Sequence, residues 1–328
     1  MSGRVLVTGG AGFIGHHLVR QLVDAGVPVR VLDPAAKHGR LPDGVEPIAG
    51  SILDPATLAA AMQGVEVVHH LAARAALWAR DPAVYERINY RGTRAVLDAA
   101  AAAGVRRVVV TSTALVLKDW REGGTVPVSE ADPRPGVAAM PGPYSRSKWR
   151  AERAVREAID AGLDAVLLYP TAPIGPPDGF FTEPTEMLRR FLRAPPPAFL
   201  ETRLNLVDVA DVATAHRLAA DRAPAGGRYI LGGEDLLFSE FLARLEALSG
   251  RRMPRRRISH ALAAATAHAA EALARVSGRP PAATVEGVRA ARAPRPYANA
   301  RAIGELGWRP RPLEDTLAET VRAILGEG

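Results

Sequence analysis

The sequence contains no cysteine, no apolar run long enough to span a bilayer, and no basic segment followed by an apolar stretch at its start. Without cysteine, neither a disulfide framework nor a cysteine metal site can form, and the composition fits a reducing compartment. The other two absences predict neither a membrane-spanning helix nor a secretory signal. We therefore expect a globular protein of the cytoplasm, with one large or two smaller domains among its 328 residues.

Acidic residues are too few to balance the basic ones: 35 against 42, for a formal net charge of +7. The excess is spread along the chain as arginine, and its one dense cluster, residues 251–257, has no interleaved aromatics. We expect that cluster to be a solvated loop and predict no specific nucleic-acid partner. Residues 258–276 are alanine-rich and amphipathic. Packing on the rest of the protein is favoured over an interfacial membrane helix, so membrane association is not expected.

The start of the chain carries the most informative pattern. An apolar strand, residues 5–7, leads into the sequence TGGAGFIG at residues 8–15, an expected helix at 16–25 and a second strand at 29–32 that ends on Asp33. Such glycines allow a tight turn, close approach of a phosphate and close helix–strand packing. The helix directs its N-terminal N–H groups at a pyrophosphate, and the carboxylate accepts ribose hydroxyls. This order predicts a dinucleotide site rather than a surface turn.

Strands and helices then alternate along the chain. Strands are expected at 46–48, 65–70, 108–110, 166–169 and 229–231, and helices from 54, over 81–103, over 144–161 and over 208–221. This alternation predicts an α/β fold of the Rossmann type, a doubly wound parallel sheet covered on both faces. Residues 118–143 are rich in proline and glycine and are expected to form a long loop.

After Pro170 the chain becomes proline-rich and, from about residue 238, mainly helical. We expect a smaller, mostly helical C-terminal cap that binds substrate. The predicted boundaries assign 1–170, 206–232 and 298–308 to a dinucleotide-binding domain, and 171–205, 233–297 and 309–328 to the cap.

Tyr144 and Lys148 stand four residues apart at the start of an expected helix, so their side chains can share one face. A tyrosine that transfers protons needs help, because its ordinary pKa is about 10. A nearby cation favours the phenolate and lowers that pKa. Such pairs also occur on ordinary helices, and it is the dinucleotide pattern upstream that favours catalysis here.

Several motifs occur in order along nearly the whole chain: TGGAGFIG, Leu71-Ala72-Ala73, Asn89, Thr111-Ser112-Thr113, Tyr144-x-x-x-Lys148, and Glu305-Leu306-Gly307-Trp308-x-Pro310. Together they resemble the extended short-chain dehydrogenases/reductases, the NAD-dependent epimerase/dehydratase family. Residues 77–82, 170–176, 204–207 and 229–234 are most similar to its hopanoid-associated sugar epimerase-like and dihydroflavonol reductase-like members.

The resemblance implies a catalytic triad of Thr113, Tyr144 and Lys148, in which threonine replaces the usual serine and Ser112 is the competing candidate. Asn89 is implied to support the central helix and to order a water. The implied cofactor-binding residues are Gly9, Gly12, Phe13, Ile14, Gly15, Asp33, Ser51, Ile52, Leu71, Ala72, Ala73, Thr111, Tyr144, Lys148, Pro170 and Thr171.

The chain departs from the family pattern in three respects. Ser51 stands where an aspartate often precedes the apolar residue at adenine. Asp33 stands where close relatives tend to carry arginine, which predicts NAD over NADP, although Lys37 and Arg40 leave NADP open. Ala172 and Leu204 replace the asparagine and arginine that nucleotide-sugar enzymes place on a diphosphate.

We therefore predict an oxidoreductase that moves a hydride between a nicotinamide cofactor and a carbonyl or alcohol of a largely apolar small molecule. One alternative is a sugar or nucleotide-sugar epimerase/dehydratase that keeps its cofactor bound. Another is a non-catalytic NAD-binding scaffold, against which the retained triad counts. The resemblance also implies a homodimer that pairs residues 81–103 and 144–161. Candidate walls of the substrate pocket are Trp78, Leu115, Leu117, Phe180, Phe181, Met187 and Phe199, each of which could instead be packing.

Overall fold

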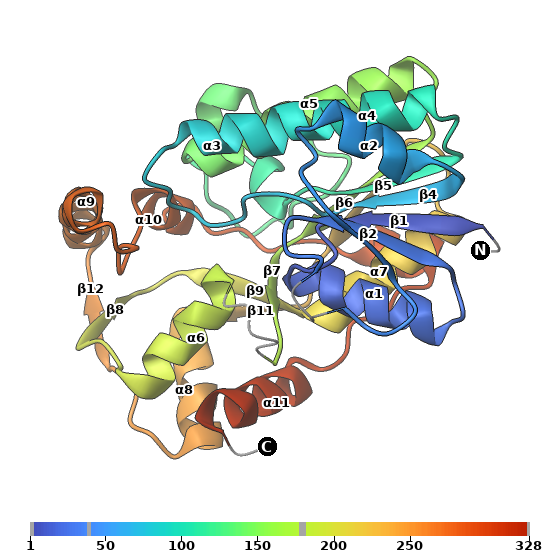
Figure 1. Cartoon of the computed structure of the whole chain (residues 1–328). Helices are drawn as coiled ribbons and strands as arrows, with labels where there is room; N and C mark the ends of the chain where they lie inside the picture. Colours follow the sequence, from blue (N-terminus) through green and yellow to red (C-terminus); the bar gives the residue numbers. More distant parts are fainter. Residues whose placement is uncertain (1–2, 38–40, 177–181, 327–328) are drawn as a thin grey trace.

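A seven-stranded parallel sheet forms the centre of the protein, described here by a computed structural model that covers residues 3–37, 41–176 and 182–326 (Figure 1). The strand order is β3-β2-β1-β4-β5-β6-β10. Every neighbouring pair is parallel. The order reverses between β1 and β4, as in a doubly wound sheet. The strands are β1 (Arg4–Thr8), β2 (Val29–Asp33), β3 (Glu46–Ala49), β4 (Val65–His70), β5 (Arg107–Thr111), β6 (Ala165–Pro170) and β10 (Arg228–Leu231).

Helices cover both faces of this sheet, which confirms the predicted fold class. Figure 1 shows α2, α4 and α5 on one side and α1 and α7 on the other. Because both faces are covered, the strands are apolar along almost their whole length rather than in alternation. The helices are α1 (Phe13–Asp24), α2 (Pro55–Met62), α4 (Gly92–Ala102), α5 (Pro143–Asp160) and α7 (Val209–Arg222).

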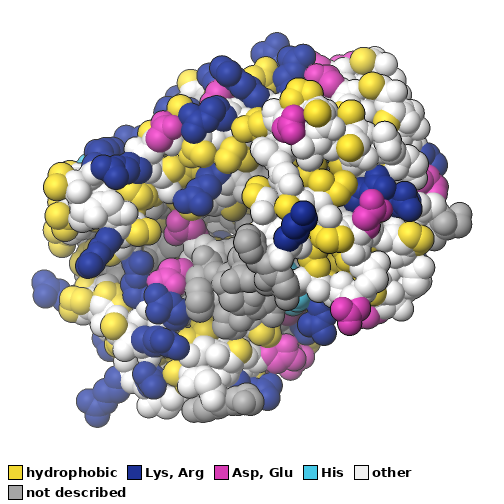
Figure 2. Space-filling view, viewed as in Figure 1, with side chains coloured by type: hydrophobic (Ala, Val, Ile, Leu, Met, Phe, Trp, Pro, Cys, Tyr) yellow, Lys and Arg dark blue, Asp and Glu magenta, His cyan; other side chains and the backbone are white. Residues whose placement is uncertain are grey.

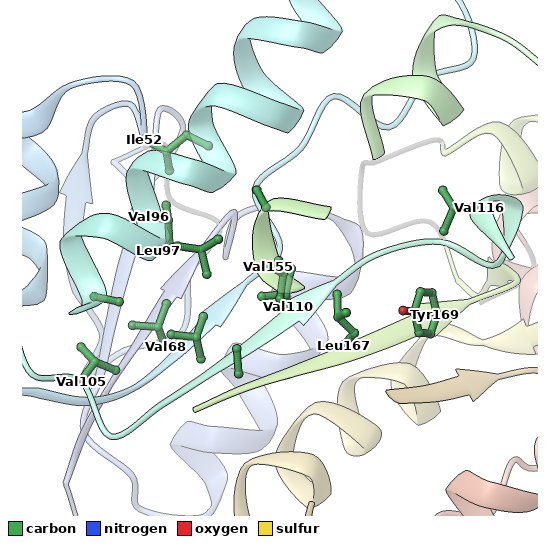
Figure 3. Packing of buried hydrophobic residues seen from close by; sticks show 14 of the residues in the cluster. Ile52, Val68, Val96, Leu97, Val105, Val110, Val116, Val155, Leu167 and Tyr169 are labelled. Atoms are coloured by element: carbon green, nitrogen blue, oxygen red, sulfur yellow. The ribbon is translucent and has the colours of Figure 1, made fainter. Parts of the chain in front are cut away.

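The two faces have separate hydrophobic cores. The first lies between the sheet and helices α2, α4 and α5, and Figure 3 shows Val96 and Leu97 of α4 and Val155 of α5 packed over the strands. The second lies under α1 and α7 and includes Trp308, whose indole N–H donates to the Asp211 carbonyl at 2.8 Å. These two cores hold the strand ends, and therefore any site built on them, in fixed positions.

The expected helix over 81–103 has a different local geometry. It consists of a short turn α3 (Ala83–Tyr85), a π-helical segment η1 (Glu86–Arg91) and then α4. A π-helical segment widens the turn by about one residue and often occurs at functional sites. Asn89, a predicted site residue, lies inside this segment.

The predicted long loop over 118–143 is confirmed, since its regular structure is limited to one turn, η3 (Val137–Ala139). The loop packs along the outer side of β10. There the Glu130 Oε1 atom accepts a hydrogen bond from the Ile230 backbone N–H at 2.6 Å. A bridge between Val128 and Tyr297 ties the loop to the C-terminal part of the chain.

A smaller region, mostly helical at its C-terminal end, lies beside the carboxyl ends of the main strands (Figure 1). It has its own apolar core and two small sheets, β11-β9-β7 and β12-β8, whose short strands the sequence pattern did not predict. Its elements are β7 (Ala172–Ile174), α6 (Glu183–Arg193), β8 (Ala198–Leu200), β9 (Arg203–Asp208), β11 (Glu234–Leu237), α8 (Phe238–Ser249), β12 (Arg256–Ile258), α9 (His260–Ser277), α10 (Val285–Ala291) and α11 (Leu313–Leu325). Between α10 and α11 the chain returns to the main sheet, where η4 (Ala302–Leu306) packs in the second core.

The surface carries basic side chains in many places rather than in one band. Figure 2 shows Lys and Arg distributed over the visible face with acidic and apolar side chains between them. Within the described residues, none of the helices has the length and apolar character needed to cross a membrane.

Candidate active site

The glycine-rich turn between β1 and α1 is packed tightly against the segment that follows β4. Gly9 has a φ of +75°, and a Cβ there would lie 2.6 Å from the Ala72 backbone nitrogen. A Cβ on Gly15 would lie 2.1 Å from the Gly9 carbonyl oxygen. Side chains are therefore excluded at both positions, and the turn brings bare backbone to the carboxyl edge of the sheet.

The N-terminus of α1 is open in the way a phosphate site requires. Gly12 is its N-cap, no side chain caps it among the described residues, and its first turn contains no acidic residue. The first N–H groups of a helix lack intrahelical partners, and the helix dipole adds partial positive charge there. This end of α1 lies at the β1–β4 reversal, where open α/β sheets bind ligands.

Asp33 lies at the end of β2, beside the glycine turn. Its Oδ2 atom accepts a hydrogen bond from the Ala11 N–H at 3.3 Å, and its Oδ1 atom accepts one from the Ala35 N–H at 2.8 Å. These bonds fix the carboxylate in orientation next to the proposed phosphate turn. Of the two cations that could offset it, Lys37 is exposed, and Arg40 lies outside the described residues.

Tyr144 and Thr113 come together at the carboxyl end of β5. Both residues are buried, with 8% and 5% of their surface exposed. Burial raises the pKa of Tyr144, the nearby Glu286 carboxylate raises it further, and the adjacent Thr113 hydroxyl lowers it. The competing candidate, Ser112, has a buried hydroxyl for which the described residues offer no hydrogen-bond partner.

Lys148 lies one turn further along α5 and is held by the end of β5. Its ammonium donates to the Thr111 carbonyl at 2.7 Å. Burial lowers the pKa of Lys148 to about 8, while the Glu152 carboxylate opposes that shift. The ammonium group therefore keeps a positive charge at neutral pH. Thr111, a predicted cofactor residue, contacts Lys148 with its backbone carbonyl rather than with its side chain.

Asn89 connects the segment that follows β4 to helix α5. Its Oδ1 atom accepts from the Arg74 N–H at 2.7 Å, and its Nδ2 atom donates to the Arg74 carbonyl at 3.1 Å and to the Ser147 hydroxyl at 2.9 Å. Ser147 in turn donates to the Tyr144 carbonyl at 2.7 Å. With these contacts the amide is fully engaged in positioning α5 against the segment after β4.

Three buried histidines beneath the site were not predicted. His70 hydrogen-bonds Thr8 at 2.8 Å and Thr93 at 2.9 Å, and burial, with the Lys148 charge as a smaller cause, lowers its pKa to about 3. His216 hydrogen-bonds the Thr111 hydroxyl at 2.9 Å, and its ring centroid lies 5.5 Å from that of His69. No motif marks these residues, because histidine in a strand or helix has no spacing that reports burial.

The other predicted cofactor residues lie around this edge. Phe13 and Ile14 begin α1, and Leu71, Ala72 and Ala73 follow β4. The Ser51 hydroxyl accepts from the Leu53 N–H at 3.1 Å, and Ile52 is buried against Gly92. Pro170 ends β6, and the Thr171 hydroxyl donates to the Asn205 side chain at 2.7 Å.

The structure separates the predicted pocket walls into different surroundings. Trp78, Leu115 and Met187 are partly buried, whereas Leu117 is 1% exposed in the main core. Phe199 stacks on Phe238, with ring centroids 5.7 Å apart, in the core of the smaller region. It also lines a cavity of about 200 Å³ whose walls include none of the three triad candidates. Phe180 and Phe181 lie outside the described residues.

Ala172 and Leu204 face apolar surroundings. Ala172 pairs with Leu206, Leu204 pairs with Leu236, and both pack against the core of the smaller region. The two positions at which nucleotide-sugar enzymes would hold a diphosphate therefore supply no polar side chain here.

One residue at the site was missed entirely by the sequence reasoning. Glu286 of α10 is 2% exposed, and its two carboxylate oxygens accept hydrogen bonds from the backbone N–H groups of Tyr144 at 3.0 Å and Ser145 at 2.8 Å. It lies more than a hundred residues from the helix that it caps, so no local pattern could reveal it.

Comparison with known proteins places this site in a family. Residues 5–232 match the family described as NAD dependent epimerase/dehydratase. The chain belongs to this family of NAD-dependent oxidoreductases and epimerases, which confirms the resemblance drawn from the motifs and, for the family as a whole, the expected NAD cofactor.

Named relatives include both reductases and epimerases. A protein of Synechocystis sp., provisionally named a dihydroflavonol 4-reductase, is 34% identical and covers 98% of this chain and 94% of its own length. A 2-alkyl-3-oxoalkanoate reductase of Stenotrophomonas maltophilia is 32% identical over 75% of this chain and 76% of its own. A UDP-glucose 4-epimerase of Azospirillum brasilense is 31% identical over 77% and 79%.

Solved structures share the whole architecture. The crystal structure of gox2253 has a TM-score of 0.86 and 32% identity, and it covers 99% of this chain and 98% of its own. The UDP-glucose 4-epimerase of Thermus thermophilus in complex with NAD has a TM-score of 0.77 and 26% identity, and it covers 99% and 100%.

Proposed function

We propose that this protein is a NAD-dependent oxidoreductase acting on the carbonyl or alcohol group of a largely apolar small molecule. The observation that carries the proposal is the burial of Thr113 and Tyr144 beside each other at the end of β5, with Lys148 one helical turn away and bonded to the Thr111 carbonyl. A buried tyrosine beside a hydroxyl and an ammonium can pass a proton to or from a substrate oxygen.

The residues at the edge of the sheet fit a dinucleotide. Bare backbone at Gly9 and Gly15, the uncapped start of α1 and the oriented carboxylate of Asp33 suit a pyrophosphate and a ribose diol in turn. Lys148 would hold the ribose next to the nicotinamide. When bound, the cofactor supplies the hydride donor or acceptor.

Each triad residue has a distinct task in this proposal. Tyr144 donates its phenolic proton to the carbonyl oxygen in reduction and removes the hydroxyl proton in oxidation. Thr113 hydrogen-bonds the same substrate oxygen and so sets its direction. Lys148 holds a positive charge one helical turn away, and a nearby cation favours the phenolate form of a tyrosine.

The apolar substrate follows from the missing polar groups. Burying a diphosphate beside Ala172 and Leu204 would leave its charges without partners, and an unpaired buried charge is costly. Apolar surface instead gains about 25 cal/mol per Å² buried. The name of the 2-alkyl-3-oxoalkanoate reductase describes such a substrate for that relative.

An epimerase is the second candidate, favoured by the relative named UDP-glucose 4-epimerase. The two functions separate in one screen. The protein is assayed with NADH against 2-alkyl-3-oxo esters and aromatic ketones, and with NAD against UDP-glucose and dTDP-glucose. Saturable NADH oxidation with a carbonyl compound is the expected result. Epimerisation of a nucleotide sugar with tightly retained cofactor would instead establish the second candidate, and cofactor binding without either reaction would favour a scaffold.

Three further features belong to the proposal. Residues 1–170, 206–232 and 298–308 form the NAD-binding domain, and 171–205, 233–297 and 309–328 form the substrate-binding cap. Two copies pair through α4 and α5, which lie side by side on one side of the sheet (Figure 1). A monomeric mass in light scattering at micromolar concentration would rule out the proposed dimer.

The cytoplasm is the proposed location, and fractionation of cells that express the native chain would test it.

A further inference from the structure

A buried carboxylate from the C-terminal region occupies the start of the catalytic helix. The two Glu286 oxygens accept from the N–H groups of Tyr144 and Ser145, and both oxygens acting as acceptors is the pattern of an ionised carboxylate. The first turn of α5 contains no acidic residue of its own. Glu286 therefore supplies, from α10, the negative charge that a helix N-terminus favours.

The chain around this contact is shaped to admit the carboxylate. A Cβ on Gly142 would lie 2.2 Å from a Glu286 oxygen, although the extended backbone of Gly142 suits any residue. Space rather than backbone conformation therefore requires glycine there. Arg289, one turn further along α10, donates to the Pro141 carbonyl at 3.3 Å. Two side chains of α10, those of Glu286 and Arg289, thus hydrogen-bond to the backbone of residues 141–145.

We propose that Glu286 is a positioning residue for Tyr144: it fixes the first turn of α5 from the C-terminal region and holds the phenol in its neutral, proton-donating form. This inference rests on the proposed function, because it assigns Tyr144 the proton transfer. It also makes docking of α10 a condition for an assembled site.

Stability alone does not explain a carboxylate in this position. Burial raises the pKa of Glu286 despite its hydrogen bonds from the Tyr144 and Ser145 N–H groups. A raised pKa in the folded state means that ionisation weakens folding as the pH rises through that value. The ionised group therefore has a net cost to the fold, as buried charges often do at functional sites.

The charged groups nearest Tyr144 are the Glu286 carboxylate and, one turn further along α5, the Lys148 ammonium, which is bonded to the Thr111 carbonyl. Glu286 raises its pKa, Thr113 lowers it, and the neutral ring of Tyr85 lies edge-on with its centroid 6.1 Å away. Further charges act on these neighbours rather than on Tyr144 itself: Arg146 on Glu286, and Arg74 and Glu183 on Tyr85. Glu286 is therefore the carboxylate whose removal changes the proton affinity of Tyr144.

The test is the pH profile of carbonyl reduction in Glu286→Gln, with NADH and the carbonyl compound that the wild type reduces fastest. We expect kcat to fall about tenfold with little change in KM for NADH, because the first turn of α5 loses one of its acceptors. The high-pH limb of kcat/KM should move about one unit lower, because the phenol loses its proton more easily.

Matched variants separate this role from a structural one. Asp208 is another buried carboxylate cap, accepting from the Ala210 N–H at 2.7 Å at the start of α7. Asp208→Asn should lower the melting temperature but leave the limb in place. Glu286→Asp keeps the charge on a shorter arm, so kcat should fall while the limb stays, and this variant decides the matter if Glu286→Gln does not fold.

Two outcomes overturn the inference. A Glu286→Gln enzyme with lower melting temperature but wild-type kcat and limb would show that the cap is structural only, as would wild-type kcat in Glu286→Asp if Glu286→Gln does not fold. Failure of the proposed function looks different. It would be seen as wild-type turnover in Tyr144→Phe, or as no reduction of any carbonyl compound by the wild type.

Discussion

Two helices, α1 and α5, begin at the same edge of the sheet and treat their N-termini in opposite ways. The start of α1 has a glycine cap, no side-chain cap among the described residues and no acid in its first turn. The start of α5 is closed by Glu286, which binds two of its N–H groups. In any helix the first N–H groups lack partners within the helix, and the N-terminus carries a partial positive charge, so both helices begin with the same physical requirement.

The difference shows how one physical feature serves two purposes. The end of α1 is left for an anionic ligand, and bare glycine backbone lets that ligand approach. The end of α5 is neutralised by the protein itself, so its side chains, rather than its N–H groups, are available for chemistry. We infer binding at α1 and proton transfer at α5. Three experiments test that division, and a fourth tests the buried layer beneath both helix ends.

The largest expected effect separates chemistry from binding. Tyr144→Phe should lower turnover by about 10²–10⁴, the usual loss when an acid–base group is removed. NAD affinity measured by calorimetry should stay near the wild-type value. Lys148→Ala should reduce both, since that side chain is assigned to the cofactor and to the phenol. Wild-type turnover in Tyr144→Phe would show that the proton takes another path.

Giving α1 its own carboxylate would break the contrast directly. Gly12→Asp places an acceptor at the N-cap, where aspartate bonds the first N–H groups and opposes a phosphate. NAD should bind at least about tenfold more weakly, or roughly 1.4 kcal/mol, in a calorimetric titration. Gly136→Asp is the control, because a Cβ there has no atom within 4 Å. Equal losses in the two variants would remove the assigned role of α1.

Asp33 sharpens the description of the α1 site. The wild type should prefer NAD over NADP by at least about tenfold, because the carboxylate repels a 2′-phosphate. Asp33→Asn should lose most of that preference while retaining an acceptor for the Ala11 and Ala35 N–H groups. Equal wild-type affinities for the two cofactors would mean that Lys37 or Arg40 outweighs Asp33.

The smallest effect concerns the layer beneath both helix ends. Burial lowers the pKa of His69 and of His70 to about 3, from an ordinary histidine pKa near 6.5. Below about pH 6.5 the unfolded chain therefore binds more protons than the folded protein does. Stability should therefore be full above about pH 6.5 and fall as the pH drops towards about 3. His69→Leu should flatten this fall in the melting temperature by an amount equivalent to about 1 kcal/mol or more. The exposed His268 is the control, and an equal flattening in His268→Leu would refute the assignment.

The sequence predicts the α1 half of this comparison far better than the α5 half. Residues 5–33 hold a strand, glycines, a helix and an acid in one continuous stretch, so local spacing encodes the site. The main sheet is predictable for the same reason, since its buried strands are apolar runs between helical segments. Tyr144 and Lys148 follow from a four-residue spacing that the dinucleotide pattern makes meaningful.

Other features depend on contacts between distant segments. Glu286 and Tyr144 meet only because α10 docks on α5, and a lone glutamate in a short helix has no distinguishing pattern. The π-helical turn around Asn89 occurs where that side chain bonds Arg74 and Ser147, which belong to other segments of the chain. The short strands of the small sheets fall below the length at which alternation can be recognised.

The contact between Glu130 and Ile230 limits how copies of this protein can assemble. β10 is the last strand of the main sheet on its side, and an outer strand with free N–H groups invites another chain to extend the sheet. Here the Ile230 N–H is already bonded to a carboxylate, and the loop that carries Glu130 covers the strand. At the opposite margin, β3 contains Pro47, which has no N–H to offer. Sheet-to-sheet aggregation is therefore obstructed at both margins, and association between copies is left to helical surfaces.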